Sequence, residues 1–375
     1  MSSSSAKRIP VGPLSLSRTH IHVLSAFIFL LSTATSSFAQ KHNGTLTPPA
    51  DPFADPKNDP FNPLRYIASN SLTAVSFSLV LLTAFIETFM MWRQGGQFML
   101  SMLIAEYTFA AGLGTRFGLT LHPDSKAIYI VEYLLVVLSP CGFIASNYVL
   151  LGRISRWLKC DKYLLIPAKK ITLVFVISDV VTFLIQAAGG SISISNNIKT
   201  AQNGAHIFLA GLALQLASFV LFTSIYVRFL VLVYKHERQT WFMDGGIKKW
   251  YNDWRSLAFA LCISCVGILI RSVYRTVELG QGFHGKLATT EGYFYGLDTL
   301  PLFISIAIFV PFWPGRFIPP FVQDPTTTVV DEEKDISRVR QEGELKVEDV
   351  SGNGRTSAAG SEGTRVDMEG VTEKP

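Results

Sequence analysis

The chain has 375 residues, of which 49% are hydrophobic and only 16% are charged, and its mean hydropathy is +0.31. A chain this apolar is unlike an ordinary soluble protein, so we expect an integral membrane protein. The net charge of +5 does not indicate nucleic-acid binding, because the basic residues lie in loops between apolar runs and form no patch with interleaved aromatic residues.

The first forty residues have the features of a targeting segment. Basic residues precede a short apolar core at 21–31, and Ser37-Phe38-Ala39 forms a small-x-small cleavage pattern. We predict a signal peptide over residues 1–39, with an uncleaved extra span as the alternative. Asn43 then begins an Asn-Gly-Thr glycosylation sequon. We therefore predict that residues 40–66 form an extracellular N-terminal segment.

Seven apolar runs follow, each about long enough to cross a membrane as a helix. They occupy residues 67–92, 97–121, 127–151, 171–190, 205–227, 256–279 and 291–313. The sequence therefore predicts an all-α membrane protein, with a bundle of seven transmembrane helices over residues 67–318.

The basic residues of the connecting loops predict the orientation. The loops after the third and fifth runs carry most of the Lys and Arg residues, whereas the loops on the other side carry only Lys126, Lys199 and Lys286. The positive-inside rule then places the N-terminus outside and the C-terminus in the cytosol. Residues 319–375 are polar and poor in aromatic residues, so we predict a disordered cytosolic tail that is open to cytosolic partners.

Charged residues in the last two runs form the most distinctive pattern. Arg271, Arg275 and Glu278 lie at positions i, i+4 and i+7, so they share one helical face. Arg271 and Asp298 lie at matching depths in consecutive helices, so we expect them to face each other. Arg275 and Glu278 should lie nearer the rim, beside Glu291. The pattern fits either an ion network that only joins two helices or a substrate-facing site.

Two other carboxyl groups lie deep in the apolar runs. We find no basic residue at the depth of Glu106 in the second run or of Asp179 in the fourth. Burial favours the neutral form of a carboxyl group, so we expect both to be protonated at rest. This would suit proton coupling or the binding of an amine headgroup. The alternative is that each is neutral and hydrogen-bonded across helices.

Further polar residues are expected to pair between helices. Arg116 and Glu132 both fall near the outer side, in the second and third runs, and would form an ion pair. Gln186 and Gln215 are expected to be interhelical hydrogen-bond partners. We find no metal-ligand spacing, no complete phosphate-binding loop and no catalytic cluster. We therefore expect no metal, no cofactor and no enzyme activity.

Several motifs across residues 65–315 together match one family pattern. The most specific is the stretch Ile270-Arg271-Ser272-Val273-Tyr274-Arg275-Thr276-Val277-Glu278. The accompanying residues are Glu106, Gly112, Arg116, Ser139-Pro140, Ala145, Tyr148, Leu151-Gly152-Arg153, Ser178-Asp179, Gln186, Gly189-Gly190, Gly211-Leu212, Gln215, Gly282, Gly285, Glu291, Tyr295, Asp298, Pro301 and Pro314-Gly315. On these residues the chain resembles the fungal RTA-like family, often described as lipid-translocating exporters. It departs from the family at Trp313, where a His is common, and at Ala110-Ala111, where a Gly-Tyr pair is usual.

The resemblance implies a plasma-membrane protein that exports or flips sphingoid long-chain bases and contributes to resistance against toxic lipids and drugs. Its expected partners are membrane lipids. A long-chain base joins a cationic amine to an apolar tail, so a carboxylate in a lipid-accessible groove would suit it. We expect Glu106, Asp179 and Asp298 to contact the amine or couple its movement. The expected ion-pair gate or scaffold consists of Arg116, Glu132, Arg271, Arg275, Glu278 and Glu291. The alternative function is a seven-span receptor or membrane stress sensor that signals through its inner loops and tail.

Overall fold

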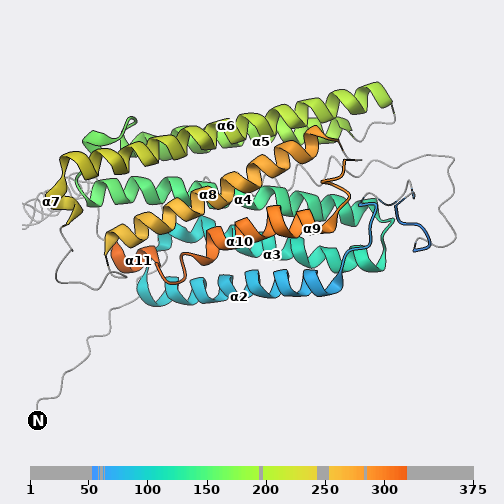
Figure 1. The fold of residues 1–375 in the computed structure, drawn as a ribbon, viewed down its shortest axis with the longest axis horizontal. Helices are drawn as coiled ribbons and strands as arrows, with labels where there is room; N and C mark the ends of the chain where they lie inside the picture. The colour runs from blue at the N-terminus through green and yellow to red at the C-terminus, as the bar shows by residue number, and fades with distance from the viewer. Residues whose placement is uncertain are drawn as a thin grey trace, which may run out of the picture. The chain divides into compact units, whose positions relative to one another are not determined.

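The computed structural model describes residues 53–318, apart from positions 58, 60–61, 63, 194–196, 243–252 and 283–284. The predicted signal peptide, the sequon at Asn43 and the predicted tail lie outside the described residues. Within the described part, every regular element is helical (Figure 1).

Six helices of the described part are long and apolar enough to cross a membrane. They are α2 (Asn70–Gln94), α3 (Leu100–Leu121), α4 (Lys126–Trp157), α5 (Ala168–Ser193), α6 (Ile198–His236) and α8 (Trp254–Gly280). Shorter helices are η1 (Gln97–Met99), η2 (Asp161–Tyr163) and α7 (Arg238–Trp241). The protein is thus an all-helical, multi-pass membrane protein.

Local sequence signals explain where several helices begin and end. The side chains of Ser125, Asn197 and Asp253 accept a hydrogen bond from the first turn of α4, α6 and α8, respectively. Gly95 and Gly96 follow α2 with φ angles of 76° and 98°. Other residues rarely adopt such angles, so this pair allows the sharp turn into η1 and α3.

The expected seventh span is interrupted. Residues 291–307 form α9 (Glu291–Tyr293), the π-helix η4 (Phe294–Thr299) and α10 (Leu300–Ala307), and turns lead on to α11 (Pro314–Phe317). None of these pieces alone is long enough to count as a span, so seven spans remain a prediction. Pro301 accounts for the interruption: it has no N–H for the Leu297 carbonyl, and its ring would clash with that carbonyl in an α-helix. The wider π turn relieves the clash.

The helices pack in chain order. α2 contacts α3, α3 contacts α4, and the series continues through α5, α6, α8 and α10, which in turn contacts α2. Figure 1 shows α2 and α3 side by side along much of their length. The η4 segment packs on both α2 and α8. This arrangement brings the charged face of α8 against Asp298.

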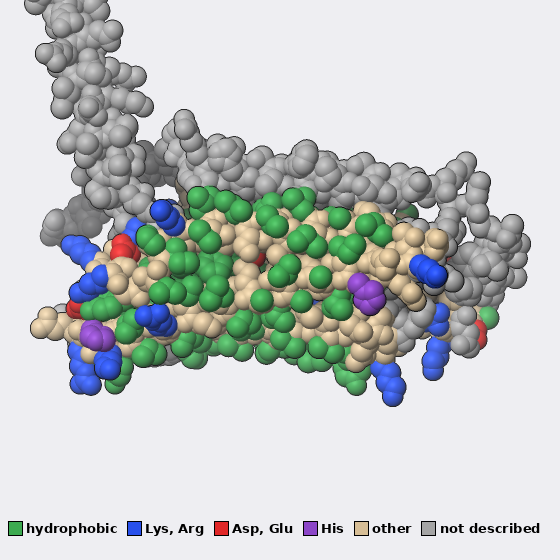
Figure 2. Space-filling view, turned by 90° about the horizontal axis from the view of Figure 1, so that it is seen from above, with side chains coloured by type: hydrophobic (Ala, Val, Ile, Leu, Met, Phe, Trp, Pro, Cys, Tyr) green, Lys and Arg blue, Asp and Glu red, His purple; other side chains and the backbone are tan. Residues whose placement is uncertain are grey.

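Apolar side chains cover the outside of the bundle. Figure 2 shows hydrophobic side chains along the middle of one face, with Lys and Arg side chains mainly toward its two ends. On α2, the exposed large apolar residues are Leu72, Val75, Leu79, Leu82, Phe85, Ile86, Phe89 and Trp92. An apolar surface this extensive is the kind that a lipid bilayer covers.

Candidate functional site

Asp298 is the centre of a buried ion network. Arg271 on α8 donates a hydrogen bond of 2.8 Å to Asp298 Oδ2. Arg275, one turn further along α8, donates to both oxygens of the same carboxylate, at 2.6 and 3.0 Å. Arg271 also donates to the backbone carbonyl of Val136 on α4, at 2.7 Å. The structure therefore brings Arg271 and Asp298 together, as their depths suggested, and adds Arg275 to the same carboxylate.

Glu278 extends this network toward the end of α8. Its Oε2 accepts a hydrogen bond of 3.0 Å from Arg275, and the Tyr274 hydroxyl lies 3.3 Å from its other oxygen. Asp298 is fully buried, whereas the Glu278 side chain is 17% exposed. Glu278 is thus the more accessible carboxylate of this network.

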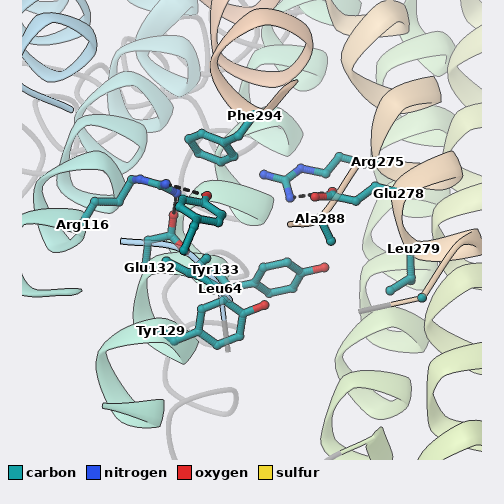
Figure 3. Close-up of a pocket in the computed structure, with 12 residues that line it drawn as sticks. Leu64, Arg116, Tyr129, Glu132, Tyr133, Arg275, Glu278, Leu279, Ala288 and Phe294 are labelled. Atoms are coloured by element: carbon teal, nitrogen blue, oxygen red, sulfur yellow. Dashed lines mark hydrogen bonds and ion pairs between the residues drawn. The ribbon is translucent and has the colours of Figure 1, made fainter. Parts of the chain in front are cut away.

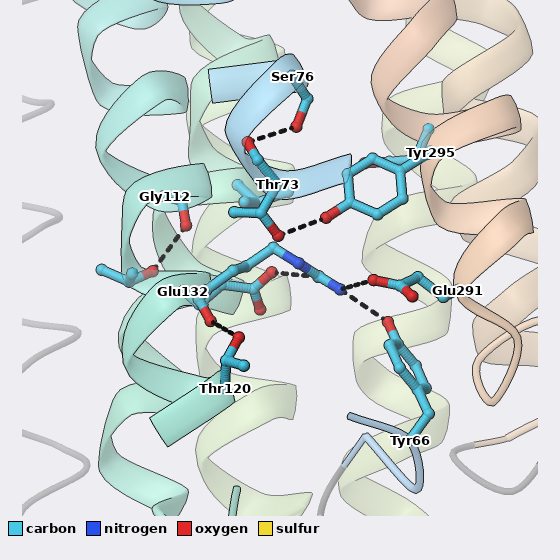
Figure 4. A network of polar contacts seen from close by, with 12 residues as sticks. Tyr66, Thr73, Ser76, Gly112, Thr120, Glu132, Glu291 and Tyr295 are labelled. Carbon is cyan, nitrogen blue, oxygen red and sulfur yellow. Dashed lines mark hydrogen bonds and ion pairs between the residues drawn. The ribbon is translucent and has the colours of Figure 1, made fainter. Parts of the chain in front are cut away.

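Arg116 on α3 centres a second network (Figure 4). Its guanidinium donates to Glu132 Oε1 at 2.8 Å and to the Tyr66 hydroxyl at 2.9 Å. It also lies 4.0 Å from Glu291 and 4.1 Å from the centre of the Phe294 ring. The expected Arg116–Glu132 pair is therefore present. We expected Glu291 beside Arg275 and Glu278, but the structure pairs it with Arg116 instead.

Backbone and hydroxyl groups hold this second network to α2. The Ser69 N–H, at the start of α2, donates to Glu291 Oε1 at 2.7 Å. The hydroxyls of Thr73 and Tyr295 lie 2.8 Å apart. Figure 4 shows Tyr295 pointing toward Thr73, with Glu291 on the same side of the network as Tyr295. Three separate parts of the chain are thus fixed around one arginine.

A cavity of about 50 Å³ lies between the two networks (Figure 3). Figure 3 shows Arg116 and Arg275 on opposite sides, with Phe294 between them and Tyr129 and Tyr133 across the space. The full lining comprises Leu64, Tyr66, Arg116, Tyr129, Glu132, Tyr133, Arg275, Glu278, Leu279, Gly282, Ala288 and Phe294. The cavity has room for one or two water-sized groups, so it fits a small polar headgroup and not a whole amphiphile. It lies at the end of the bundle where α2 begins, which the loop charges predict to be the outer end.

The charges around this cavity do not balance. The two networks contain three arginines and four carboxylates, namely Arg116, Arg271, Arg275, Glu132, Glu278, Glu291 and Asp298. With all seven groups ionised, the site carries one excess negative charge. Chemically, such a site favours a cation over an anion.

Glu106 and Asp179, the other two expected amine contacts, do not line this cavity. Asp179 on α5 accepts a hydrogen bond of 3.0 Å from Tyr148 on α4, which is the cross-helix bond of the alternative interpretation. Glu106 on α3 is fully buried and faces Glu87 on α2. The three carboxylates thus lie in three different settings and do not form one amine site.

Sequence reasoning missed Glu87. It lies within the first apolar run, and an ionisable residue inside a membrane span is itself a signal of function. The sequence analysis also missed the 3.1 Å hydrogen bond between Asn147 on α4 and Ser264 on α8. The expected pair Gln186 and Gln215 does meet, at 2.8 Å. No group of three or more His, Cys, Asp or Glu side chains in the described part could hold a metal ion.

Comparison with known proteins identifies the family. The profile of the RTA1 like protein family matches residues 102–320, which is more than half of the chain. The chain belongs to this family. The part of this RTA1-like protein that matches includes all seven ionisable groups of the two networks, whereas Glu87 precedes it.

Three relatives illustrate the range of the RTA1-like family. Protein RTA1 of Saccharomyces cerevisiae is 34% identical over 186 residues, which cover 50% of this chain and 56% of that protein. Protoporphyrin uptake protein 1 of the same yeast is 32% identical over 188 residues, covering 50% and 59%. The sphingoid long-chain base transporter RSB1 of S. cerevisiae (strain YJM789) is 24% identical over 218 residues, covering 50% and 56%. The matches thus span little more than half the length of these relatives. No solved structure matches the chain.

Proposed function

We propose that this RTA1-like protein exports or flips sphingoid long-chain bases, or related cationic amphiphiles, across the plasma membrane. Its action would contribute to resistance against toxic lipids and drugs. The observation that carries the proposal is the cavity between two ion networks that together have one excess negative charge when all seven groups are ionised. A long-chain base supplies the single positive charge that the site lacks.

Within this proposal, Glu278 is the carboxylate that receives the amine. It lines the cavity and is partly exposed. Both oxygens of Asp298, by contrast, already accept hydrogen bonds from arginines, which favours a scaffold role for Asp298. An ammonium group competes with Arg275 for Glu278, while Arg275 keeps its two bonds to Asp298. The Arg275–Glu278 pair then acts as the gate, and the apolar tail stays in contact with lipid.

The relatives' names point to substrates of opposite charge. One is named for a sphingoid base, which is a cation, and another for protoporphyrin, which carries carboxylates. The excess of carboxylates around the cavity supports the cation for this chain. An anion would have to displace Glu132 or Glu278 from arginines that already lie in the site.

The test is movement of a fluorescent long-chain base in liposomes that contain the purified full-length protein. We expect the base to move faster in these liposomes than in empty ones. It should also move faster than a carboxylated porphyrin does in the same protein-containing liposomes. Equal rates with and without protein shown to be folded would contradict direct transport.

The alternative of a receptor or stress sensor makes a different prediction about the tail. A transporter should keep its rate in liposomes when the chain is cut after Pro320, because the cavity residues all precede this point. A protein that moves no lipid in liposomes but loses a cellular stress response on the same truncation would act as a sensor.

A further inference from the structure

Glu87 and Glu106 lie at matching depths on two neighbouring helices. Glu87 is seven residues before Gln94, the last residue of α2, and Glu106 is six residues after Leu100, the first residue of α3. Each is therefore about 10 Å inside the bundle from the end where α2 turns into α3. This is the opposite end from the cavity described above. Neither glutamate belongs to the two arginine networks.

Both carboxyl groups are buried, and no group in the described residues donates a hydrogen bond to them. Both side chains are 0% exposed. They face each other within hydrogen-bonding reach, yet with both ionised none of their four oxygens has a hydrogen-bond partner in the described part of the chain. A carboxylate offers only acceptors, so a hydrogen bond between the two groups needs a proton on one of them.

The helices packed around the pair offer no compensating charge in the described part. Arg93 on α2 is exposed, and Tyr107 on α3 shares a hydrogen bond of 3.0 Å with Thr88. α3 also packs on α4 and η1, and α2 on η4, α10 and α11. On α4, the Arg153 guanidinium lies 4.3 Å from the centre of the Phe98 ring.

The charged groups on the other elements that pack on α2 and α3 in the described part are bound elsewhere. On η4, Asp298 is held by two arginines and Tyr295 by Thr73. On α11, Arg316 donates to the Pro311 carbonyl. The sequences of η1 and α10 contain no titratable side chain. Two ionised glutamates would therefore leave two like charges side by side in a buried site, which is strongly unfavourable.

We propose that Glu87 and Glu106 form a proton-binding site between α2 and α3. A proton on one carboxyl group makes the hydrogen bond to the other, in the way that a pair of close carboxyl groups shares a proton. A metal ion would need several more oxygen ligands, and no group of three or more His, Cys, Asp or Glu side chains in the described part could hold one. The proposal does not depend on the function proposed above.

Proton release would have a mechanical consequence. Without the proton, the two charges repel, and the repulsion separates α2 from α3 near the turn at Gly95 and Gly96. If the protein moves a cationic amphiphile, this site gives a proton gradient a place to act, separate from the headgroup cavity.

Infrared difference spectroscopy of the full chain in lipid nanodiscs tests the proton directly, because protonated and ionised carboxyl groups absorb at separate frequencies. We expect a protonated carboxyl band at neutral pH that disappears as the pH is raised. The band should be smaller in the double variant Glu87→Gln, Glu106→Gln, where only other buried carboxyl groups such as Asp179 can contribute to it. The two amides keep a hydrogen bond without a titratable proton. The matched control Glu237→Gln, at an exposed ion pair, should retain the band.

Identical neutral-pH spectra for the wild-type protein and the double variant would overturn the proposal. Loss of the band on adding sodium at constant pH would also overturn it, because it would indicate a metal-cation site.

Wild-type protein alone gives a second test if the double variant does not fold. A hydrophobic carbodiimide, which reacts with protonated carboxyl groups, should label Glu87 or Glu106 less as the pH rises. It should leave Asp298, whose oxygens are held by arginines, unlabelled, and the reverse pattern would contradict the proposal.

Discussion

At the scale of single residues, Asp298 accepts three hydrogen bonds from arginines, more than the other carboxylate of its network accepts. It binds two arginines of α8, and one of these also holds the Val136 carbonyl on α4. Burying three charges is costly, and their mutual contacts offset this cost only while all are present. Asp298 therefore determines how η4, α8 and α4 fit together.

Replacing Asp298 by Asn should strongly destabilise the protein. The change leaves two buried arginines with a neutral partner, and breaking a buried pair of this kind costs roughly 3–5 kcal/mol. Thermal unfolding in nanodiscs measures the loss. Glu237→Gln makes the same type of change in an exposed pair with Lys162 and should alter the melting temperature little. Equal effects of the two variants would show that the buried network does not stabilise the fold.

At the scale of elements, the π-helix η4 sets the direction of the Asp298 side chain. The wide turn lies directly before Pro301, and relative to an α-helix it shifts the preceding residues by about 100° around the axis, the rotation of one residue. The proline thus affects the ion network without touching it.

Pro301→Ala should weaken the contact between η4 and α8. Alanine supplies the missing N–H and allows an α-helical turn, which rotates Asp298 away from Arg271 and Arg275. A double-mutant cycle separates this effect from a general one. We expect Pro301→Ala to cost more stability in the wild-type background than in Asp298→Asn. An equal loss in both backgrounds would mean that Pro301 acts independently of the network.

Close approach of α8 and α10 depends on Gly267. A Cβ atom at this position would lie 2.5 Å from the Pro301 carbonyl oxygen, closer than real contacts allow. Gly267→Ala should therefore push the helices apart and lower the melting temperature, although alanine favours a helix by about 1 kcal/mol over glycine. Gly280→Ala is the matched control on the same helix, because a Cβ atom there meets nothing within 4 Å. A destabilising Gly280→Ala and a neutral Gly267→Ala would contradict this packing.

At the scale of the whole molecule, hydropathy and depth predicted much of what the structure contains. The long helices follow the apolar runs, and residues at matching depths meet, as do Arg271 with Asp298 and Gln186 with Gln215. Depth can be counted along a helix from the sequence. Rotation and choice of neighbour depend on packing across the bundle, so the partner of Glu291 and the separation of Glu106, Asp179 and Asp298 did not follow from the sequence.

The π-helix η4 could not be predicted from the sequence for a related reason. Pro301 signalled a distortion, but sequence alone does not say whether a proline produces a kink or a wide turn. Glu87 differs, because its position inside the first apolar run was visible. Its importance became clear only when α2 and α3 were placed side by side, with the two glutamates at one level.

In the proposed function, an excess carboxylate in the cavity recognises a cationic headgroup. The most direct measurement compares the movement of a fluorescent long-chain base and its neutral N-acetylated form in liposomes that contain wild-type, Glu278→Gln or Glu237→Gln protein. We expect the wild-type and Glu237→Gln proteins to prefer the base. In Glu278→Gln, the ratio of the rate for the base to the rate for its N-acetylated form should fall about tenfold. This fall corresponds to the loss of one charged hydrogen bond of roughly 1.5 kcal/mol. Equal movement of both lipids by the wild-type protein, or an unchanged preference in Glu278→Gln, would contradict the account.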